Sequence, residues 1–158
     1  MSRLVAYYSR TGNTKFVAEE IAKQLGADLC EIRDKKKREG KLNYLGCGKD
    51  AMQENLTEIE ISKPIEKYDF VVVGSPVWAG KITPAIRKFL VSNDFSNKQV
   101  AVFITLDDKP EMTFKNLKET IKLKSLVGEL AIFKALKKRE ENKQKIADWC
   151  RQIQQSLA

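Results

Sequence analysis

A run of hydroxyl-bearing and small residues, Ser9-Arg10-Thr11-Gly12-Asn13-Thr14, has the composition of an anion-binding loop. Three of its side chains carry a hydroxyl that can donate a hydrogen bond, and Gly12 lets the backbone approach a ligand without a Cβ clash. A simpler interpretation is a polar turn in which Thr11 or Asn13 caps the helix that follows. The six residues alone are compatible with both interpretations.

Two further loops hold groups that could contact a bound ring. Ser75-Pro76-Val77-Trp78-Ala79-Gly80 places an indole where no regular element surrounds it, which suits stacking on a planar heteroaromatic group. Alternatively, Trp78 folds back over the sheet edge or joins a protein interface. Leu106-Asp107-Asp108-Lys109-Pro110 offers backbone amides and two carboxylates, which would otherwise serve helix capping and solvation.

The sequence lacks the side chain that most often transfers protons in enzymes. The sequence has no histidine, and its three cysteines, Cys30, Cys47 and Cys150, are widely spaced. Catalysis of the Ser-His-Asp or Cys-His type is therefore excluded, and we expect neither a metal site nor a disulfide framework. We predict free thiols in a reducing compartment and no catalytic side chain, so that a cofactor would carry any chemistry.

The three loops are positioned by alternating strands and helices. Apolar runs predict strands at 4–8, 27–32, 70–73, 99–105 and within 126–136, and helical spacing predicts helices at 15–25, 43–55, 84–90, 113–122 and 140–157. Thr83 is the expected N-cap of the helix that begins with Pro84. The alternation predicts an α/β, doubly wound, five-stranded parallel sheet with helices on both faces. The loops converge on one site if the strand order is 2-1-3-4-5.

Length and charge restrict the possible classes of protein. The 158 residues fit a single domain, 1–158, and no segment approaches the roughly 20 apolar residues that cross a bilayer, so we expect a soluble cytoplasmic protein. The net charge of +8 raises the possibility of nucleic-acid binding. The longest uninterrupted basic run, Lys35-Lys36-Lys37-Arg38, is more typical of a solvated segment, although the charge could select an acidic protein partner.

The first loop resembles the S/T-x-T-G-N-T signature of flavodoxins, and the segment 74–80 is similar to the loop that covers the flavin ring in flavodoxin-like proteins. The two motifs occur in the right order, each after a predicted strand and before a predicted helix. The resemblance implies a flavodoxin-like fold and bound FMN. It also implies that Arg10 points to solvent or to the loop rim. The implied phosphate ligands are Ser9, Thr11, Asn13, Thr14 and backbone amides that include Gly12.

The resemblance also implies roles at the ring end of the cofactor. Trp78 would stack on the flavin, and Ala79-Gly80 could form a type II turn with Gly80 supplying the positive φ. The third loop lacks the tyrosine that usually stacks on the outer flavin face, so Tyr44 could supply a substitute aromatic wall. Backbone amides from 106 to 108 would meet the pyrimidine end of the ring, and Asp107 and Asp108 would lower the second reduction potential by charge repulsion.

These expectations favour an FMN protein that carries electrons between redox partners, as a monomer or weak dimer, without nucleic acid or membrane. The alternative is an FMN-dependent NAD(P)H or quinone oxidoreductase, in which the missing aromatic residue leaves room for a substrate over the ring. A third hypothesis is a flavin-free signalling or nucleic-acid-binding module with the same fold.

Overall fold

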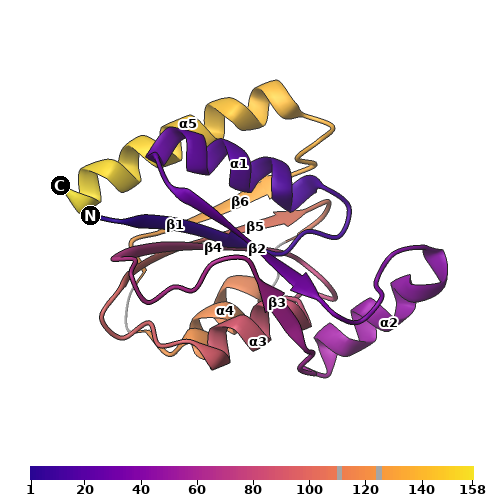
Figure 1. The fold of residues 1–158 in the computed structure, drawn as a ribbon. Helices are drawn as coiled ribbons and strands as arrows, with labels where there is room; N and C mark the ends of the chain where they lie inside the picture. The colour runs from indigo at the N-terminus through magenta and orange to yellow at the C-terminus, as the bar shows by residue number, and fades with distance from the viewer. Residues whose placement is uncertain (110–111, 124–125) are drawn as a thin grey trace.

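The computed structural model describes residues 1–109, 112–123 and 126–158, within which six strands form one sheet covered by helices on both faces (Figure 1). In chain order the elements are β1 Arg3–Tyr7, α1 Asn13–Leu25, β2 Asp28–Asp34, α2 Lys41–Met52, β3 Ile59–Ile61, β4 Phe70–Pro76, α3 Pro84–Ser92, β5 Gln99–Leu106, α4 Thr113–Ile121, β6 Gly128–Phe133 and α5 Arg139–Leu157.

The strand order is β3-β2-β1-β4-β5-β6. The five predicted strands are β2, β1, β4, β5 and β6, all parallel and in the predicted order. The prediction of a purely parallel five-stranded sheet is wrong at one edge, where β3 pairs with β2 in the antiparallel sense and Ile61 lies opposite Ile32. Two of the three β3 residues are exposed, so no apolar run marks this strand in the sequence.

The central strands are buried on both faces because helices cover each side of the sheet. Successive side chains alternate between two cores: Val5 and Val72 pack with α1 and α5, whereas Leu4 and Val71 pack with α3. Figure 1 shows the same layers, with α1 and α5 above the sheet and α3 and α4 below it. The carboxyl ends of the parallel strands all lie at the same end of the sheet, and α2 lies next to that end.

Several predicted boundaries hold and others shift. Thr83 caps α3, because its Oγ1 accepts a hydrogen bond from the backbone N–H of Ile86 at 3.4 Å. Ser75 and Pro76 belong to the end of β4 rather than to the loop after it.

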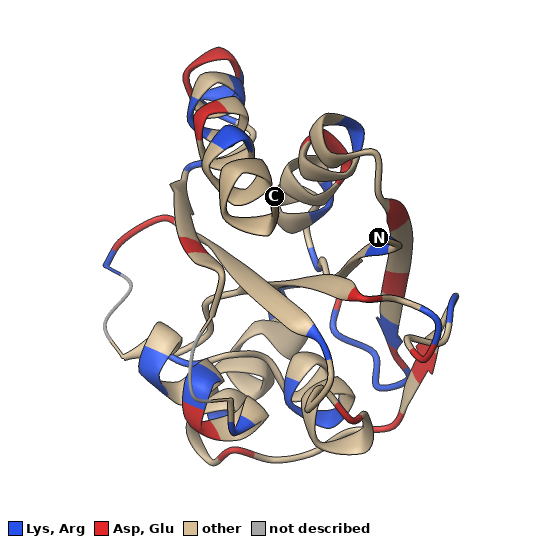
Figure 2. Ribbon diagram, turned by 90° about the vertical axis from the view of Figure 1, so that its left-hand side faces the viewer, with Lys and Arg blue, Asp and Glu red and all other residues tan. Residues whose placement is uncertain are grey.

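The three cysteines are free and buried. In Figure 2, basic and acidic residues are interleaved along the helices and loops instead of forming one basic stripe.

Candidate functional site

The first loop ends at the N-terminus of α1. Gly12 is the N-cap residue, with a left-handed backbone, and no side chain forms a capping hydrogen bond. The N–H of Gly12 donates to Ser9 Oγ at 3.1 Å, which closes the loop on itself. The interpretation of Thr11 or Asn13 as a simple helix cap is therefore wrong.

The amides of the first turn of α1 remain available to a ligand. Within the described part of the chain, the backbone N–H groups of residues 13–15 have no acceptor, as expected where a helix begins without a side-chain cap. They lie at the positive end of the helix dipole. Phe16 is the first residue whose N–H bonds back, to the Gly12 carbonyl at 3.0 Å. This arrangement of donors favours an anion.

Side-chain hydrogen bonds fix the first loop to the strands on the far side of the sheet. The Asn13 amide donates to Thr11 Oγ1 at 3.2 Å and accepts from the backbone N–H of Leu136 at 3.1 Å. The buried hydroxyl of Thr14 lies 2.7 Å from that of Thr105, at the end of β5. Hydrogen bonds thus hold the start of α1 to the end of β5, directly before the third loop.

The second loop is a tight hairpin turn. Trp78 and Lys81 exchange two backbone hydrogen bonds of 3.0 Å, and the two residues between them both have positive φ, 50° at Ala79 and 74° at Gly80. Positive φ at both central positions defines a type I′ turn. The predicted positive φ of Gly80 is confirmed, but the predicted type II turn is wrong because Ala79 is also left-handed.

Trp78 is packed between a tyrosine and an arginine. The edge of its ring meets Tyr8 at a centroid distance of 5.6 Å, and the guanidinium of Arg38 lies 5.7 Å from the indole centroid. Only 4% of Arg38 is exposed; its Nε donates to Asp34 at 2.9 Å and its Nη1 to Asp50 at 2.6 Å. The prediction that the run 35–38 is entirely solvated is therefore wrong at its last residue.

Arg10 bridges the first loop and the segment before α2. Its Nε donates to the Arg38 carbonyl at 2.8 Å and its Nη2 to the Gly40 carbonyl at 3.2 Å, while its guanidinium lies 5.6 Å from the Tyr44 ring centroid. The expectation that Arg10 points to solvent or to the loop rim is therefore wrong. Its side chain fixes the position of residues 38–40 next to the first loop.

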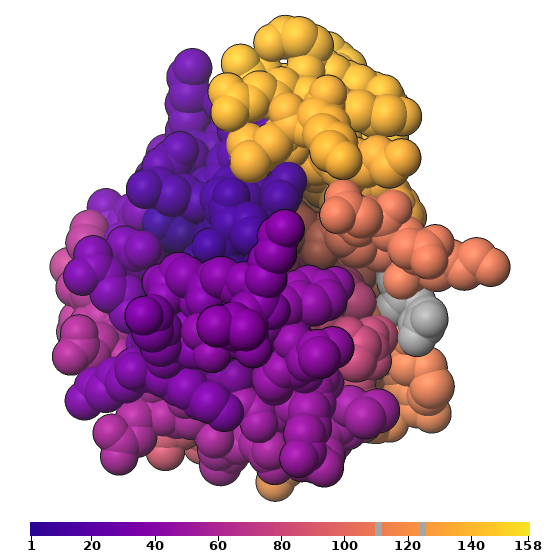
Figure 3. Space-filling model, turned by 90° about the vertical axis from the view of Figure 1, so that its right-hand side faces the viewer, coloured from indigo at the N-terminus to yellow at the C-terminus, as the bar shows by residue number. Residues whose placement is uncertain are grey.

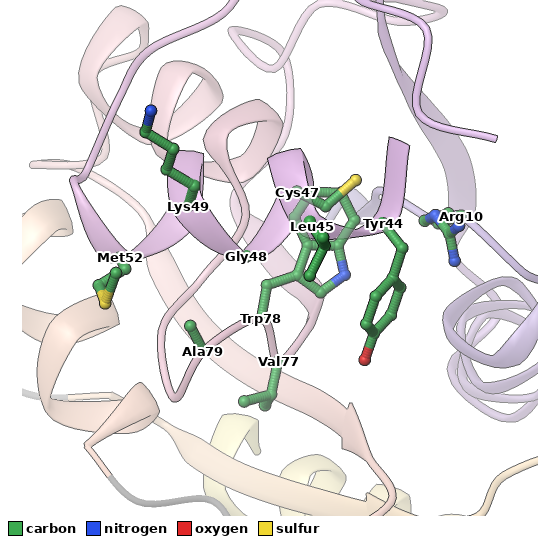
Figure 4. A pocket seen from close by; sticks show the side chains of 10 residues that line it. All are labelled: Arg10, Tyr44, Leu45, Cys47, Gly48, Lys49, Met52, Val77, Trp78 and Ala79. Carbon is green, nitrogen blue, oxygen red and sulfur yellow. The ribbon is translucent and has the colours of Figure 1, made fainter. Parts of the chain in front are cut away.

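Two adjoining cavities lie between these loops. The smaller one, of about 200 Å³, is lined by Arg10, Thr11, Asn13, Thr14, Tyr44, Pro76, Val77, Trp78, Thr105, Leu106 and Asp107. The larger one, of about 430 Å³, is lined by Arg10, Tyr44, Leu45, Cys47, Gly48, Lys49, Met52, Val77, Trp78 and Ala79. In Figure 4, the indole of Trp78 rises from its loop toward α2, and the Tyr44 ring hangs from α2 beside it. Four residues line both cavities, which therefore form one trough.

Some predicted site residues lie outside the lining of this trough. Ser75 is buried, and its hydroxyl bonds internally to the Pro76 carbonyl at 2.8 Å and to the Thr83 N–H at 3.2 Å. Ser9, Gly12, Gly80 and Asp108 also lie outside the lining. Tyr44, suggested as a substitute aromatic wall, lines both cavities. Pro110, at the end of the third predicted loop, lies outside the described residues.

A polar cluster of residues from α4 and from the segment after α2 holds the hairpin turn in place. The Glu54 carboxylate accepts hydrogen bonds from Lys81 Nζ at 2.9 Å and from Asn116 Nδ2 at 3.1 Å. The hydrogen bond from Lys81 is the largest reason why the pKa of Glu54 is lowered. Thr113 Oγ1 donates to the Gly80 carbonyl at 2.8 Å. The turn is thereby fastened to the segment after α2 and to α4.

Sequence reasoning missed Arg38 and the Glu54 cluster. A local indication existed for Arg38, because Asp34 precedes it by four residues, but that spacing is informative on helices and this segment is not helical. The described residues hold no group of three or more His, Cys, Asp or Glu side chains that could bind a metal ion. Among them no helix is both long and apolar enough to span a membrane.

Comparison with known proteins points in one direction. A family model described as Flavodoxin matches residues 2–153. A flavodoxin from Haemophilus influenzae is 34% identical over 101 residues, which make up 61% of this chain and 45% of that protein. The match thus spans less than half of that relative's length.

Solved structures share the fold at lower identity. A flavoprotein from Lactobacillus acidophilus NCFM, crystallised in complex with FMN, superposes with a TM-score of 0.72 at 23% identity, covering 87% of this chain and 97% of that one. Oxidised flavodoxin 2 from Bacillus cereus superposes with a TM-score of 0.60 at 20% identity, covering 98% and 99% of the two chains. At these identities the likeness shows the common fold alone.

Proposed function

The chain belongs to the flavodoxin family, and from that premise we propose that it binds FMN and carries electrons between redox proteins. Bound FMN supplies the reversible uptake and release of electrons, and the protein supplies binding, orientation and electrostatics. The observation that carries the proposal is the trough, in which the first turn of α1 and its hydroxyl groups share one cavity with Trp78 and Tyr44.

The donor set of the trough fits the two ends of FMN. The phosphate needs several hydrogen-bond donors and a favourable potential, which the free amides of residues 13–15 and the hydroxyl of Thr11 provide at the start of α1. The isoalloxazine ring needs flat apolar contacts, which Trp78 and Tyr44 provide. The hydrogen bonds of Arg10 go to backbone carbonyls, so the proposed phosphate ligands are amides and hydroxyls alone.

The remaining residues act on the cofactor through their neighbours. Arg38 fixes the indole of Trp78 from its buried side-chain position, and the cluster around Glu54 holds the hairpin turn in place. Leu45 and Met52 add apolar surface to the lining of the larger cavity.

Titration of the purified protein with FMN tests the proposal. We expect saturable binding with quenched flavin fluorescence, and we expect Trp78→Ala to weaken binding by about tenfold or more and to shift the flavin spectrum, because one stacking face is lost. Trp149→Phe is the matched control, since Trp149 packs in the opposite core with α5 and should leave binding unchanged. A protein that takes up no FMN, or equal affinity in wild type and Trp78→Ala, would contradict this assignment.

An FMN-dependent NAD(P)H or quinone oxidoreductase is the second candidate. The observation in its favour is the larger cavity, of about 430 Å³, which leaves space beside Trp78 and Ala79 for a second planar molecule. The two functions separate in a simple assay. A carrier exchanges electrons with redox proteins and reacts slowly with NAD(P)H alone, whereas rapid NAD(P)H oxidation with quinone turnover would favour the enzyme.

A further inference from the structure

The outer face of α2 exposes large apolar side chains to solvent. Leu42 is 98% exposed, Leu45 82% and Met52 59%. Together with Lys41 and Lys49 they occupy one side of the helix, because their spacing of three, four and seven residues repeats every helical turn. We call these five residues the α2 outer face. The buried residues of the helix, Cys47 and Ala51, lie on its opposite side.

Exposure of this kind is unusual for a helix fixed in place. Single apolar residues on a surface are ordinary, but several on one face beside an open cavity mark an interaction site. Contacts on the inner side keep α2 from turning this face inward: Asp50 is paired with Arg38, and the Lys81 ammonium reaches both the Met52 carbonyl at 3.4 Å and the Glu54 carboxylate at 2.9 Å. The apolar side chains are therefore presented to solvent by the fold.

The charges around the α2 outer face are mostly positive and mostly unpaired. Four exposed lysines in this region form no ion pair with any described residue: Lys35, Lys37, Lys41 and Lys49. Of the carboxylates in residues 34–54, those of Asp34, Asp50 and Glu54 are engaged in ion pairs, which leaves Glu39 as the one exposed acidic side chain there without such a pair. The region therefore has a positive potential.

The face lies next to the trough. Leu45, Lys49 and Met52 belong to the lining of the larger cavity as well as to the outer face. In Figure 3, which views the molecule from the side of α2, the purple surface of α2 and its flanking residues adjoins the indigo surface of the first loop. A protein bound here would sit close to the ring end of the trough.

We propose that the α2 outer face docks an acidic redox protein, which exchanges electrons with the bound flavin; this proposal rests on the proposed function. The leucines and Met52 supply a small apolar centre, and the unpaired lysines supply the rim and steer a negatively charged partner toward it. A second copy of this chain fits poorly, because a two-fold interface would bring this positively charged face of one copy against the same face of the other.

Electron transfer to the FMN-loaded protein from a reduced acidic [2Fe–2S] ferredoxin, followed by stopped flow, tests the charge component. We expect Lys37→Glu/Lys41→Glu to lower the second-order rate constant about tenfold or more at low ionic strength, and the difference from wild type to close in 0.5 M salt, at about which ionic strength charges are screened within a few ångströms. Neither residue lines the trough, so FMN affinity should be unchanged.

The matched control reverses the charge of two exposed lysines that form no ion pair with any described residue and that lie near the amino-terminal ends of the strands. Lys23 and Lys122 lie at the C-terminal ends of α1 and α4, which point away from the carboxyl ends of the strands. Lys23→Glu/Lys122→Glu changes the net charge by the same amount. If it slows electron transfer as much as Lys37→Glu/Lys41→Glu, overall charge governs the reaction and the docking proposal is overturned.

A separate variant tests the apolar part of the α2 outer face. Leu42→Ser should not affect folding, because the side chain is 98% exposed, and it should lower the rate constant by about threefold even in high salt. Val91→Ser, at a 54% exposed position on α3, is the control and should have no effect. Equal rates in wild type and Leu42→Ser would overturn the assignment of the face.

Two other occupants have distinct outcomes. A dimer in sedimentation experiments that Leu42→Ser dissociates would replace the proposal with a homodimer interface. Co-sedimentation with phosphatidylserine vesicles, lost in Lys37→Glu/Lys41→Glu, with no effect of that variant on the ferredoxin reaction, would replace it with a membrane surface. Failure of the proposed function looks different, since the protein would then bind no FMN or exchange electrons with no protein at any ionic strength.

Discussion

Ala79 occupies a backbone conformation that an L-residue with a Cβ adopts at a cost. Its φ of 50° places it in the left-handed region, which costs a non-glycine residue about 1–2 kcal/mol. Glycine would remove that cost, but its greater conformational entropy in the unfolded chain would cost about 0.4–1 kcal/mol of stability. Since Ala79 is exposed, no packing is lost, and we expect Ala79→Gly to stabilise the protein by about 0.5–1 kcal/mol in chemical denaturation.

The neighbouring residue provides the opposite test. Gly80 has a φ of 74°, so Gly80→Ala should destabilise the protein by about 1 kcal/mol where Ala79→Gly stabilises it. The two variants change the same turn by one methyl group each. If Ala79→Gly proves less stable than wild type, the turn does not have the type I′ conformation in solution.

Residues whose roles depend on the local chain were predictable, and residues whose roles depend on distant contacts were not. The loop 9–14 was recognised because its hydroxyls, its glycine and the helix that follows are contiguous. Arg38 becomes a site residue only when β4 brings Trp78 to it, 40 residues later in the sequence. In the same way, Arg10 was expected in solvent or at the loop rim, because no local pattern in the sequence indicates its hydrogen bonds to the carbonyls of Arg38 and Gly40.

At the scale of elements, α2 is held to the rest of the protein mainly by polar contacts. Its buried residues are Cys47 and Ala51, so the apolar contribution to its docking is small. Asp50 on α2 accepts hydrogen bonds from Lys36 Nζ at 2.7 Å and Arg38 Nη1 at 2.6 Å. The attachment of α2 over the trough should therefore respond to pH.

The direction of the pH dependence follows from the pKa of Asp50. Burial acts to raise that pKa, but side-chain hydrogen bonds outweigh burial and hold it well below its ordinary value of 3.8; the donors are Lys36, Arg38 and Asn55. Because the folded pKa is depressed, the stabilisation is complete at pH values above the unfolded pKa and is lost progressively as pH falls from the unfolded pKa through the folded pKa, where Asp50 takes up a proton. We expect the attachment of α2 to weaken progressively as pH falls below about 4, before the sheet unfolds.

Trp78 fluorescence in a Trp149→Phe background measures this detachment, since Trp78 lines the cavity under α2. Asp50→Asn removes the charge but keeps the shape, and should weaken the attachment by about 2 kcal/mol at neutral pH. Its fluorescence should already resemble the acid form at pH 7 and change little on acidification. A wild type and Asp50→Asn with the same acid transition would show that other carboxylates control α2.

Strands were predictable from sequence where both faces are covered. The runs at 4–8 and 70–73 consist of buried residues, which is why uninterrupted apolar stretches marked them. The edge strand β3 escaped prediction because Glu60 and Ile61 are exposed and its pairing with β2 is set by a tertiary contact. The fold of the central sheet was thus encoded locally, and its edge was not.

At the scale of the whole molecule, the single domain predicted for residues 1–158 stays a prediction that unfolding experiments can test. The sheet separates two cores, one with α1 and α5 and one with α3, and the same strands contribute side chains to both. If the helices on either face detached, they would expose strands that also form the other core. Heat should therefore unfold both cores in one cooperative transition.

Ligand binding should shift that transition by an amount that reports on the phosphate loop. A ligand that binds only the folded state at 100 times its Kd adds about 2.7 kcal/mol of stability, which corresponds to roughly 5–10 °C in Tm for a chain of this size. We expect FMN to produce such a shift and riboflavin, which has the same ring without the phosphate, to produce a much smaller one at the same concentration. The difference arises because the free amides of residues 13–15 and the Thr11 hydroxyl then have no anion to bind. Differential scanning calorimetry measures both shifts. Equal shifts with the two flavins would indicate that the binding energy comes from the aromatic end of the trough and not from the first loop.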